Sequence, residues 1–285
     1  MSYHAVAMFS GGVGSWAAAK RAAEKYGREN LTLLFADTLI EDPDLYRFLD
    51  QAAADVGAPL VRVADGRTPW QVFRDRRMLG NSRIANCSIE LKQRPAREWM
   101  VANAPDAVVV LGIDWTEEHR LAGARKGWAP WAVEAPLCER PYLAKNELLA
   151  DLDRAGIARP ALYSEGFLHN NCGGGCVRAG VGQFAHLFRA RPETFAEWEA
   201  GEQAMRDYLN ADVSILRDRT GGTTKPLTLA SVRERLERTP SMFADEDWGG
   251  CGCFVDDVGT EPAEAEGLAV SAFGGKPAAE RGGQP

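Results

Sequence analysis

The architecture expected of this chain follows from one segment, Ser10-Gly11-Gly12-Val13-Gly14-Ser15. An apolar run at 4–9 precedes the segment and predicts a strand, and residues 16–24 after it predict a helix. Glycines allow positive φ angles and a close approach of backbone N–H groups to an anion, and the following helix adds the positive end of its dipole. Ser10 and Ser15 add hydroxyl donors. Strand, loop and helix together predict a phosphate site, with an ordinary tight turn as the alternative.

Alternating strands and helices predict the fold class. Four apolar runs are expected to form strands: 4–9, 31–37, 60–65 and 107–113. Helical patterns lie between them, one at 43–56 and one that begins near Cys87. This alternation is typical of an α/β protein with a doubly wound parallel sheet covered by helices on both faces. Because such sheets bind ligands at the carboxyl ends of their strands, we expect three segments beside the loop: Asp37-Thr38, Asp65-Gly66-Arg67 and the segment from Gly112 to Arg120.

After about residue 140 the alternation of strands and helices gives way to helical and cysteine-containing segments, and the sequence predicts three regions. Residues 1–140 are expected to form the α/β domain, and 141–255 a helical region that contains most of the cysteines. Within that region we expect a helix at 145–155 and two amphipathic helices in 182–209, broken near Pro192. Residues 256–285 are rich in Ala, Glu, Gly and Pro and are expected to be disordered.

Bulk properties narrow the class of protein. The net charge of −7 over 285 residues argues against broad nonspecific binding to nucleic acid, although a local basic patch stays open. No segment approaches the roughly 20 apolar residues that a membrane span needs, and the N-terminus has no signal-peptide pattern, so we expect a cytoplasmic protein. In a reducing compartment the six cysteines are expected to be metal ligands, redox groups or buried thiols.

Several segments, taken in order, resemble the phosphoadenosine phosphosulfate (PAPS) reductase family of the PP-loop superfamily, which has the adenine nucleotide alpha hydrolase-like fold. They are the loop at 10–15, Ala36-Asp37-Thr38 with Glu41-Asp42-Pro43, Asn86-Cys87-Ser88-Ile89-Glu90-Leu91-Lys92, Gly112 with Glu117-Glu118 and Arg120, and Leu162-Tyr163-Ser164-Glu165-Gly166-Phe167 before Cys172. The resemblance covers roughly residues 4–200. It implies that ATP, PAPS or adenylyl sulfate (APS) is bound, with magnesium as an optional ion near Asp37. The implied nucleotide contacts are Ser10, Gly11, Gly12, Val13, Gly14, Ser15, Asp37, Thr38, Lys92, Gly112 and Arg120.

The resemblance also implies a metal centre. Some members of the family, including APS reductases and DNA phosphorothioation enzymes, hold a four-iron four-sulfur cluster on cysteines in matching places. The matching residues here are Cys87, Cys172 and Cys176. Thiolates are soft ligands that suit iron or zinc, so a structural zinc on the last two is the rival interpretation. The fourth ligand stays open between Cys138, the pair Cys251 and Cys253, and an iron without a protein ligand, as in related tRNA-thiolating enzymes.

Two departures from the family bear on the chemistry. ATP-cleaving PP-loops carry an acid at the position of Gly14, and its absence weakens the expectation of metal-assisted cleavage. Sulfonucleotide reductases carry a C-terminal Glu-Cys-Gly-Leu-His segment with the nucleophilic cysteine, and this chain has none. Cys251 or Cys253 is the candidate catalytic thiol in its place, which would require a lowered pKa.

The resulting hypothesis is an adenine-nucleotide-dependent sulfurtransferase that forms an adenylated intermediate and takes sulfur from a cluster or a thiol carrier. Release of sulfite from APS or PAPS is the first alternative, and a nucleotide-binding subunit of a nucleic-acid modification complex is the second. A homodimer is compatible with each. Arg217, Arg219 and Lys225 surround Gly221-Gly222 and are further candidates for phosphate contacts, with a solvated surface as the alternative.

Overall fold

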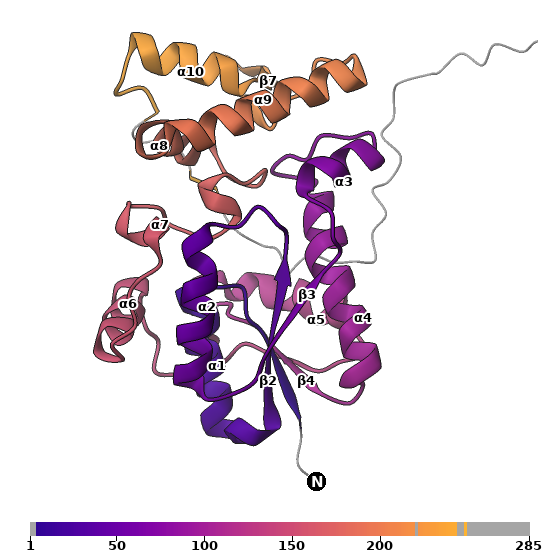
Figure 1. Ribbon diagram of the computed structural model, residues 1–285, viewed down its shortest axis with the longest axis vertical. Coiled ribbons are helices and arrows are strands. Elements are labelled where there is room, and N and C mark those ends of the chain that lie inside the picture. The colour runs from indigo at the N-terminus through magenta and orange to yellow at the C-terminus, as the bar shows by residue number, and fades with distance from the viewer. Residues whose placement is uncertain (1–3, 220–221, 244–247, 250–285) are drawn as a thin grey trace, which may run out of the picture.

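The computed structural model describes residues 4–219, 222–243 and 248–249. Its centre is a five-stranded parallel sheet in the order β3-β2-β1-β4-β5 (Figure 1). The strands are β1 (Ala5–Met8), β2 (Leu31–Asp37), β3 (Leu60–Ala64), β4 (Val108–Val110) and β5 (Val133–Glu134). This sheet confirms the expected α/β fold. The four expected strands are present, whereas β5 has only two residues and gives no apolar run to detect.

Helices cover both faces of the sheet. The helices α1 (Val13–Tyr26), α2 (Pro43–Val56) and α6 (Lys145–Arg154) pack in one hydrophobic core with β1 and β2. The helices α4 (Arg94–Asn103) and α5 (Leu121–Trp128) pack in the core of the opposite face. The two layers flank the sheet in Figure 1. Because α6 belongs to the first core, the segment after residue 140 begins by covering the sheet.

Local signals explain where the second helix begins and ends. The Asp42 side chain accepts a hydrogen bond from the Asp44 N–H at 2.9 Å, and Pro43 occupies the first turn, where no N–H partner is needed. Gly57 follows with φ of 75°, a left-handed conformation that glycine adopts without strain. The expected bounds 43–56 are therefore those observed.

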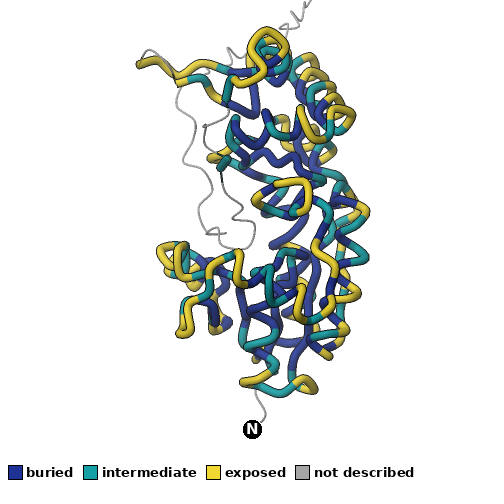
Figure 2. The backbone as a smooth tube through the Cα atoms, turned by 90° about the vertical axis from the view of Figure 1, so that its left-hand side faces the viewer, coloured by how far each residue is buried: buried dark blue, intermediate teal, exposed yellow. Residues whose placement is uncertain are grey.

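A second packed region lies beyond the carboxyl ends of the strands. Its helices are α3 (Pro69–Asp75), α8 (Val181–Ala190), α9 (Pro192–Leu209) and α10 (Leu229–Arg238). The antiparallel pair β6 (Leu216–Asp218) and β7 (Lys225–Leu227) lies between α9 and α10 in the chain. The break between α8 and α9 falls at Pro192, as expected. Buried backbone runs through both packed regions (Figure 2). Within the described residues no helix has the length and apolar character to cross a membrane.

Short helical segments connect these elements. They are η1 (Arg28–Asn30), η2 (Ser88–Gln93), η3 (Trp115–Arg120), η4 (Pro136–Cys138), α7 (Ala161–Ser164) and η5 (Cys172–Gly174). Two of them matter for the site: η2 is a π-helical turn that leads directly into α4, and η5 carries the first cysteine of the Cys172 and Cys176 pair. Irregular turns of this kind are frequent at functional sites. The expected disordered region 256–285 lies outside the described residues.

Candidate functional site

The glycine loop joins β1 to α1 in a conformation that needs glycine. Gly11 has φ of +78°, and a Cβ there would lie 2.9 Å from Leu45 Cγ of α2. Gly112, at the end of β4, approaches the loop from the neighbouring strand. A Cβ on Gly112 would lie 2.8 Å from the Ser15 backbone nitrogen. The loop therefore fits between α2 and β4 with no room for a side chain at either position.

The first turn of α1 presents unused backbone donors. Gly12 is the N-cap and supplies no side-chain hydrogen bond to the turn. Val13 N–H donates to the Tyr163 hydroxyl at 3.3 Å, and the Ser15 hydroxyl donates to the Gly12 carbonyl at 2.8 Å. In the part of the chain that the structure describes, the N–H groups of Gly14 and Ser15 donate to no protein acceptor. A helix N-terminus with such donors and a positive dipole end is suited to an anion.

These donors border a cavity of about 470 Å³. The cavity lies between the ends of β1 and β4, the two adjacent strands at which the sheet order reverses direction. Ligands of open α/β sheets bind at this kind of switch point. Of the residues named from the sequence, the cavity is lined by Ser10, Gly12, Val13, Gly14, Ser15, Lys92, Gly112 and Arg120.

Three of the expected nucleotide contacts do not line this cavity. Gly11 shapes the loop from outside it. Thr38 is buried and donates a hydrogen bond to Glu41 at 2.9 Å, and Asp37 accepts one from the Tyr46 hydroxyl at 3.0 Å. In this structure Asp37 and Thr38 therefore organise the end of β2.

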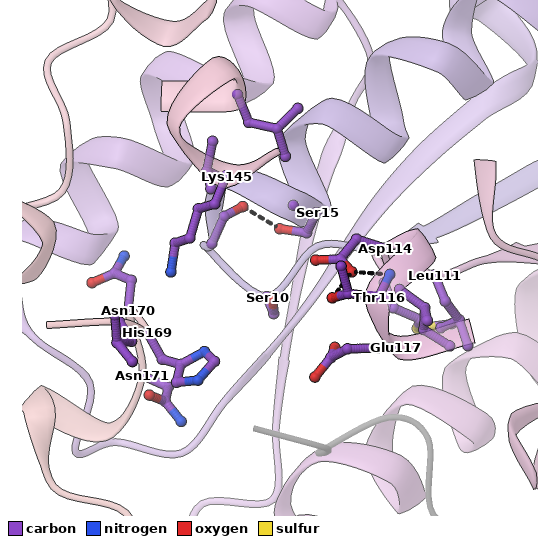
Figure 3. A pocket seen from close by; sticks show the side chains of 18 of the residues that line it. Ser10, Ser15, Leu111, Asp114, Thr116, Glu117, Lys145, His169, Asn170 and Asn171 are labelled. Carbon is purple, nitrogen blue, oxygen red and sulfur yellow. Dashed lines mark hydrogen bonds between the residues drawn. The ribbon is translucent and has the colours of Figure 1, made fainter. Parts of the chain in front are cut away.

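Several cavity residues were not named as nucleotide contacts. Figure 3 shows His169, Asn170 and Asn171 grouped on one wall, with Asp114, Thr116 and Glu117 on the other side of Ser10. Lys145 from the start of α6 also lines the cavity. A run of three polar side chains directly before Cys172 is the signal that could have identified the first wall.

The wall of His169, Asn170 and Asn171 offers acceptor atoms. Asn170 Nδ2 donates to the Gly11 carbonyl at 2.7 Å, which turns its Oδ1 away from the loop backbone. The Oδ1 atoms of Asn170 and Asn171 are both buried and have no hydrogen-bond partner among the described residues. An unsatisfied buried acceptor costs about 1–3 kcal/mol, so these two oxygens beside the cavity are candidates for hydrogen bonds to ordered water, or to a ligand when the side chains turn.

Charged groups of both signs surround the cavity. Burial lowers the pKa of Lys145, while Asp114 and Glu117 raise it. Burial raises the pKa of the Glu117 carboxyl, and Arg120, 2.9 Å from it, acts in the opposite direction. Lys145 also lies over the Tyr163 ring, 4.7 Å from its centroid. Lys145 and Arg120 therefore lie close to carboxylates, and a phosphate in the cavity would share these cations with Asp114 and Glu117.

His169 makes the stability of the protein depend on pH. Burial, followed by the positive charges of Lys145 and Arg120, lowers the pKa of His169 to about 4. The unfolded chain takes up this proton near pH 6.5 and the folded chain only near pH 4, so stability is fully present above pH 6.5 and falls as the pH drops. We expect a loss of about 2 kcal/mol between pH 6.5 and 5 from this group.

Urea unfolding of the His169→Gln variant at several pH values measures this contribution. The variant is expected to lose less stability than the parent chain between pH 6.5 and 5, by that amount. His119→Gln changes an exposed histidine and is the matched control, expected to follow the parent curve. Parallel curves for the parent chain and His169→Gln would contradict the assignment.

The cysteine pair lies next to a buried ion pair. Cys172 N–H donates to Glu41 Oε2 at 2.5 Å, and Lys92 Nζ lies 3.2 Å from Glu41 Oε1. The hydrogen bond with Cys176 and burial raise the pKa of Cys172 well above its usual value, as does the Glu41 carboxylate, while Lys92 lowers it. Without a metal the neutral thiol is therefore favoured at Cys172.

The other cysteines are placed differently. Cys87 is half-buried and packs against the hydrophobic cluster that contains Cys172 and Cys176. Cys138 lies in η4, 3.5 Å from the Ile113 carbonyl, and packs against the core of the sheet. No group of three or more His, Cys, Asp or Glu side chains that could hold a metal ion occurs within the ranges described above. The structure thus brings two of the three expected ligands into contact.

The expected catalytic thiols lie outside the described residues. Gly249, the last described residue, forms an isolated bridge with Ala179. The Gly180 N–H donates to the Trp248 carbonyl at 2.9 Å, and the His186 and Trp248 rings lie 5.0 Å apart. The chain at 248–249 therefore returns to the segment that follows Cys176.

Comparisons with known proteins give distant structural likenesses. Neither protein-family models nor curated proteins give a match. Solved structures that this chain is similar to include a PAPS reductase from Candida auris in a phosphate complex, with 13% identity, a TM-score of 0.41, and coverage of 60% of this chain and 81% of that chain. Another is an NH3-dependent NAD synthetase from Campylobacter jejuni subsp. jejuni NCTC 11168 in complex with the nitrate ion, with 13% identity, a TM-score of 0.40, and coverage of 74% and 85%. At TM-scores below 0.5 these likenesses assign no activity.

Proposed function

We propose that the chain is an enzyme that binds ATP or an adenylylated nucleotide in the 470 Å³ cavity, with phosphate on the first turn of α1. The observation that carries this proposal is the uncapped α1 N-terminus, with the N–H groups of Gly14 and Ser15 bordering the cavity. Lys145 and Arg120 supply charge, and Ser10 supplies a hydroxyl. A volume in this range suits a small organic ligand.

The other walls suit the remainder of a nucleotide and a second substrate. Leu111, Ile113, Trp115, Leu143 and Leu168 give the cavity an apolar side on which an adenine ring can pack. The amide side chains of Asn170 and Asn171 line the cavity, and their Oδ1 atoms accept hydrogen bonds from hydroxyl or amine groups once they turn toward it. The His169 imidazole, which its lowered pKa keeps neutral, can accept a hydrogen bond from a substrate hydroxyl or amine.

The proposed reaction is sulfur transfer through an adenylate. An oxygen of the acceptor attacks the α-phosphorus of ATP, and pyrophosphate leaves. The terminal sulfur of a carrier persulfide (R–S–SH) then attacks the activated carbon, and AMP leaves with the acceptor's oxygen. A second thiol attacks the inner sulfur of the carrier, which releases the thiolated product and leaves the carrier as a disulfide. Lys145 and Arg120 balance charge at the phosphates. His169 accepts a hydrogen bond from the acceptor, whose proton passes to solvent water.

The cysteine pair is the proposed place of the sulfur chemistry. Cys172 and Cys176 fit two ligand positions of a thiolate metal site, because they are in contact and buried. Cys87 is the proposed third ligand of an iron-sulfur cluster, with zinc on the pair as the alternative. A bound cluster would supply redox-active, sulfide-bearing iron at this place. Cys251 and Cys253 stay candidates for the catalytic thiol.

Reduction of APS or PAPS to sulfite is the second candidate, and one observation favours it. Gly14 stands where ATP-cleaving loops carry an acid, and a Cβ there would lie 3.2 Å from the Gly112 carbonyl oxygen. A side chain at this position would press its Cβ against that oxygen, and the loop carries no carboxylate to assist cleavage of ATP.

Nucleotide binding is tested first by calorimetry with ATP, APS and PAPS. The Lys145→Met variant is expected to bind the preferred nucleotide at least tenfold more weakly, because a cation is removed from its phosphates. Lys20→Met removes a lysine that pairs with Asp55 outside the cavity and is the matched control. Equal affinities of the parent chain and Lys145→Met would contradict the proposed placement.

Product analysis under anaerobic conditions separates the activities. Formation of AMP and pyrophosphate from ATP in the presence of a carrier persulfide, a second thiol and an acceptor supports sulfur transfer. Sulfite released from APS or PAPS supports the second candidate, and binding without turnover indicates a nucleotide-binding subunit.

Metal content tests the cysteine assignment. Iron, sulfide and zinc analysis with ultraviolet-visible and electron paramagnetic resonance spectra is made on the anaerobically purified protein. Cys172→Ala is expected to lose the metal, whereas Cys138→Ala, in the core of the sheet, is expected to retain it. If the parent protein is colourless and contains zinc, the cysteines hold a structural zinc ion and the proposed cluster is wrong. A parent protein without any metal would contradict both.

A further inference from the structure

A second cavity of about 220 Å³ lies on the other packed region, between the segment after α3 and the pair β6 and β7. Its polar lining consists of Asn81, Ser82, Arg83, Arg217, Arg219 and Thr224. Three guanidinium groups with amide and hydroxyl donors form a lining suited to phosphate oxygens. None of these residues lines the 470 Å³ cavity, so the arginines near Gly221-Gly222 do not extend the proposed nucleotide site.

The three arginines lack balancing carboxylates. Within the described ranges, the side chains of Arg83, Arg217 and Arg219 take part in no hydrogen bond or ion pair, and each residue is exposed. In a chain of net charge −7, a group of three such cations is not a consequence of composition. Many other surface arginines of this chain pair with acids, as Arg154 does with Asp151.

The nearby acids are held by other arginines. Asp218 separates Arg217 from Arg219 in sequence, and strand alternation turns it to the other face, where it lies 3.0 Å from Arg235. Asp212 pairs with Arg206 at 2.6 Å, and Asp75 pairs with Arg67 at 2.8 Å. The positive charge of the cavity is therefore left for an external anion.

An exposed aromatic ring lies in the same packed region as this cavity. Tyr208 at the end of α9 is 42% exposed, and the guanidinium carbons of Arg74 and Arg77 lie 5.4 and 5.6 Å from its ring centroid. Arg77 is four residues before Asn81, so the backbone between them spans at most about 14 Å. Figure 1 shows α3 beside the end of α9, and the two helices are in contact. Cations that follow an exposed ring are typical of single-strand binding, where bases stack and phosphates are neutralised.

We infer that this surface, formed by Arg83, Arg217, Arg219, Arg74, Arg77 and Tyr208, binds a single-stranded segment of nucleic acid. The three arginines of the cavity contact backbone phosphates, and Tyr208 stacks on a base. The arginines and the Tyr208 ring are exposed, which favours an extended polyanion over a small enclosed phosphate ligand. The inference does not depend on nucleotide binding in the 470 Å³ cavity.

The test uses fluorescence anisotropy with labelled 20-nucleotide RNA and DNA single strands at several salt concentrations. The triple variant Arg83→Gln/Arg217→Gln/Arg219→Gln is expected to bind at least tenfold more weakly at low salt. The slope of log K against log salt is expected to fall in magnitude by about 2, because three phosphate contacts are lost. The Tyr208→Ala substitution is expected to weaken the binding of single strands more than the binding of a duplex of the same sequence.

A matched triple variant controls for net charge. Arg62→Gln/Arg154→Gln/Arg159→Gln also removes three positive charges, at surface arginines that pair with acids elsewhere. It is expected to bind single strands like the parent chain. Thermal unfolding of the cavity variant is expected to be unchanged or slightly raised, since mutual repulsion of three cations is removed.

The outcomes of these experiments distinguish the phosphates of a nucleic acid from free inorganic phosphate as the ligand. Equal losses in both triple variants, or no binding by the parent chain, would overturn the inference. Binding of inorganic phosphate that the cavity variant loses, without binding of either single strand, would also overturn it and leave a small-anion site. Calorimetry of ATP with the cavity variant is expected to match the parent chain, so failure of this inference and failure of the proposed function remain distinguishable.

Discussion

The Gly112→Ala variant is expected to lose high-affinity binding of the nucleotide. A Cβ at this position would lie 2.8 Å from the Ser15 nitrogen and 2.9 Å from the Gly14 carbonyl carbon. Both are backbone atoms of the first turn of α1, so no side chain can rotate away, and β4 and the loop must separate. Overpacking of this kind costs about 1–3 kcal/mol. Since the displaced N–H groups are the proposed phosphate donors, we expect affinity for ATP to fall at least tenfold as well.

Calorimetry and urea unfolding of the same preparation measure the two effects of Gly112→Ala. Gly66→Ala is the control, because Gly66 also has restricted geometry, with φ of +95°, but a Cβ there meets nothing within 4 Å. This control is expected to lose stability through backbone strain and to keep the affinity of the parent chain. Unchanged affinity in Gly112→Ala would show that the phosphates do not use the first turn of α1.

Lys92→Met is expected to destabilise the fold by about 3–5 kcal/mol, the usual effect of removing one partner from a buried ion pair. The side chains of Lys92 and Glu41 are 5% and 1% exposed. The variant leaves the Glu41 carboxylate with hydrogen bonds from Thr38 and from the Cys172 N–H. Glu41 thus joins the end of β2 to the cysteine segment, and its unbalanced charge would weaken both.

Chemical unfolding of three variants tests the buried pair. The double variant Lys92→Met/Glu41→Gln removes both charges and is expected to recover most of the lost stability. Arg76→Met is the control, because Arg76 is half-exposed and its partner Glu90 keeps Arg67 and Arg94. It is expected to change stability by less than about 1 kcal/mol. A Lys92→Met variant no less stable than Arg76→Met would show that the pair contributes little.

Much of the local structure is encoded in short segments of the sequence. The loop at 10–15 between an apolar run and a helical pattern predicts β1 and α1. The spacing of apolar residues and the position of the glycines are both signals that lie within a few residues of each element. Asp42-Pro43 and Gly57 fix both ends of α2, and Pro192 separates α8 from α9. Backbone preferences and helix caps act within a few residues, so no knowledge of the rest of the fold is needed to predict these elements.

The tertiary structure alone decides which distant groups meet. Asn170 reaches the Gly11 carbonyl across 159 positions, and Lys145 enters the cavity from α6, although neither position carries a periodic signal. Asp37 and Thr38, expected beside the phosphates, instead bond to Tyr46 and Glu41. Arg217 and Arg219 line a separate cavity with Arg83. These placements depend on packing between segments far apart in the chain, and the contacts that select them have no counterpart in local sequence.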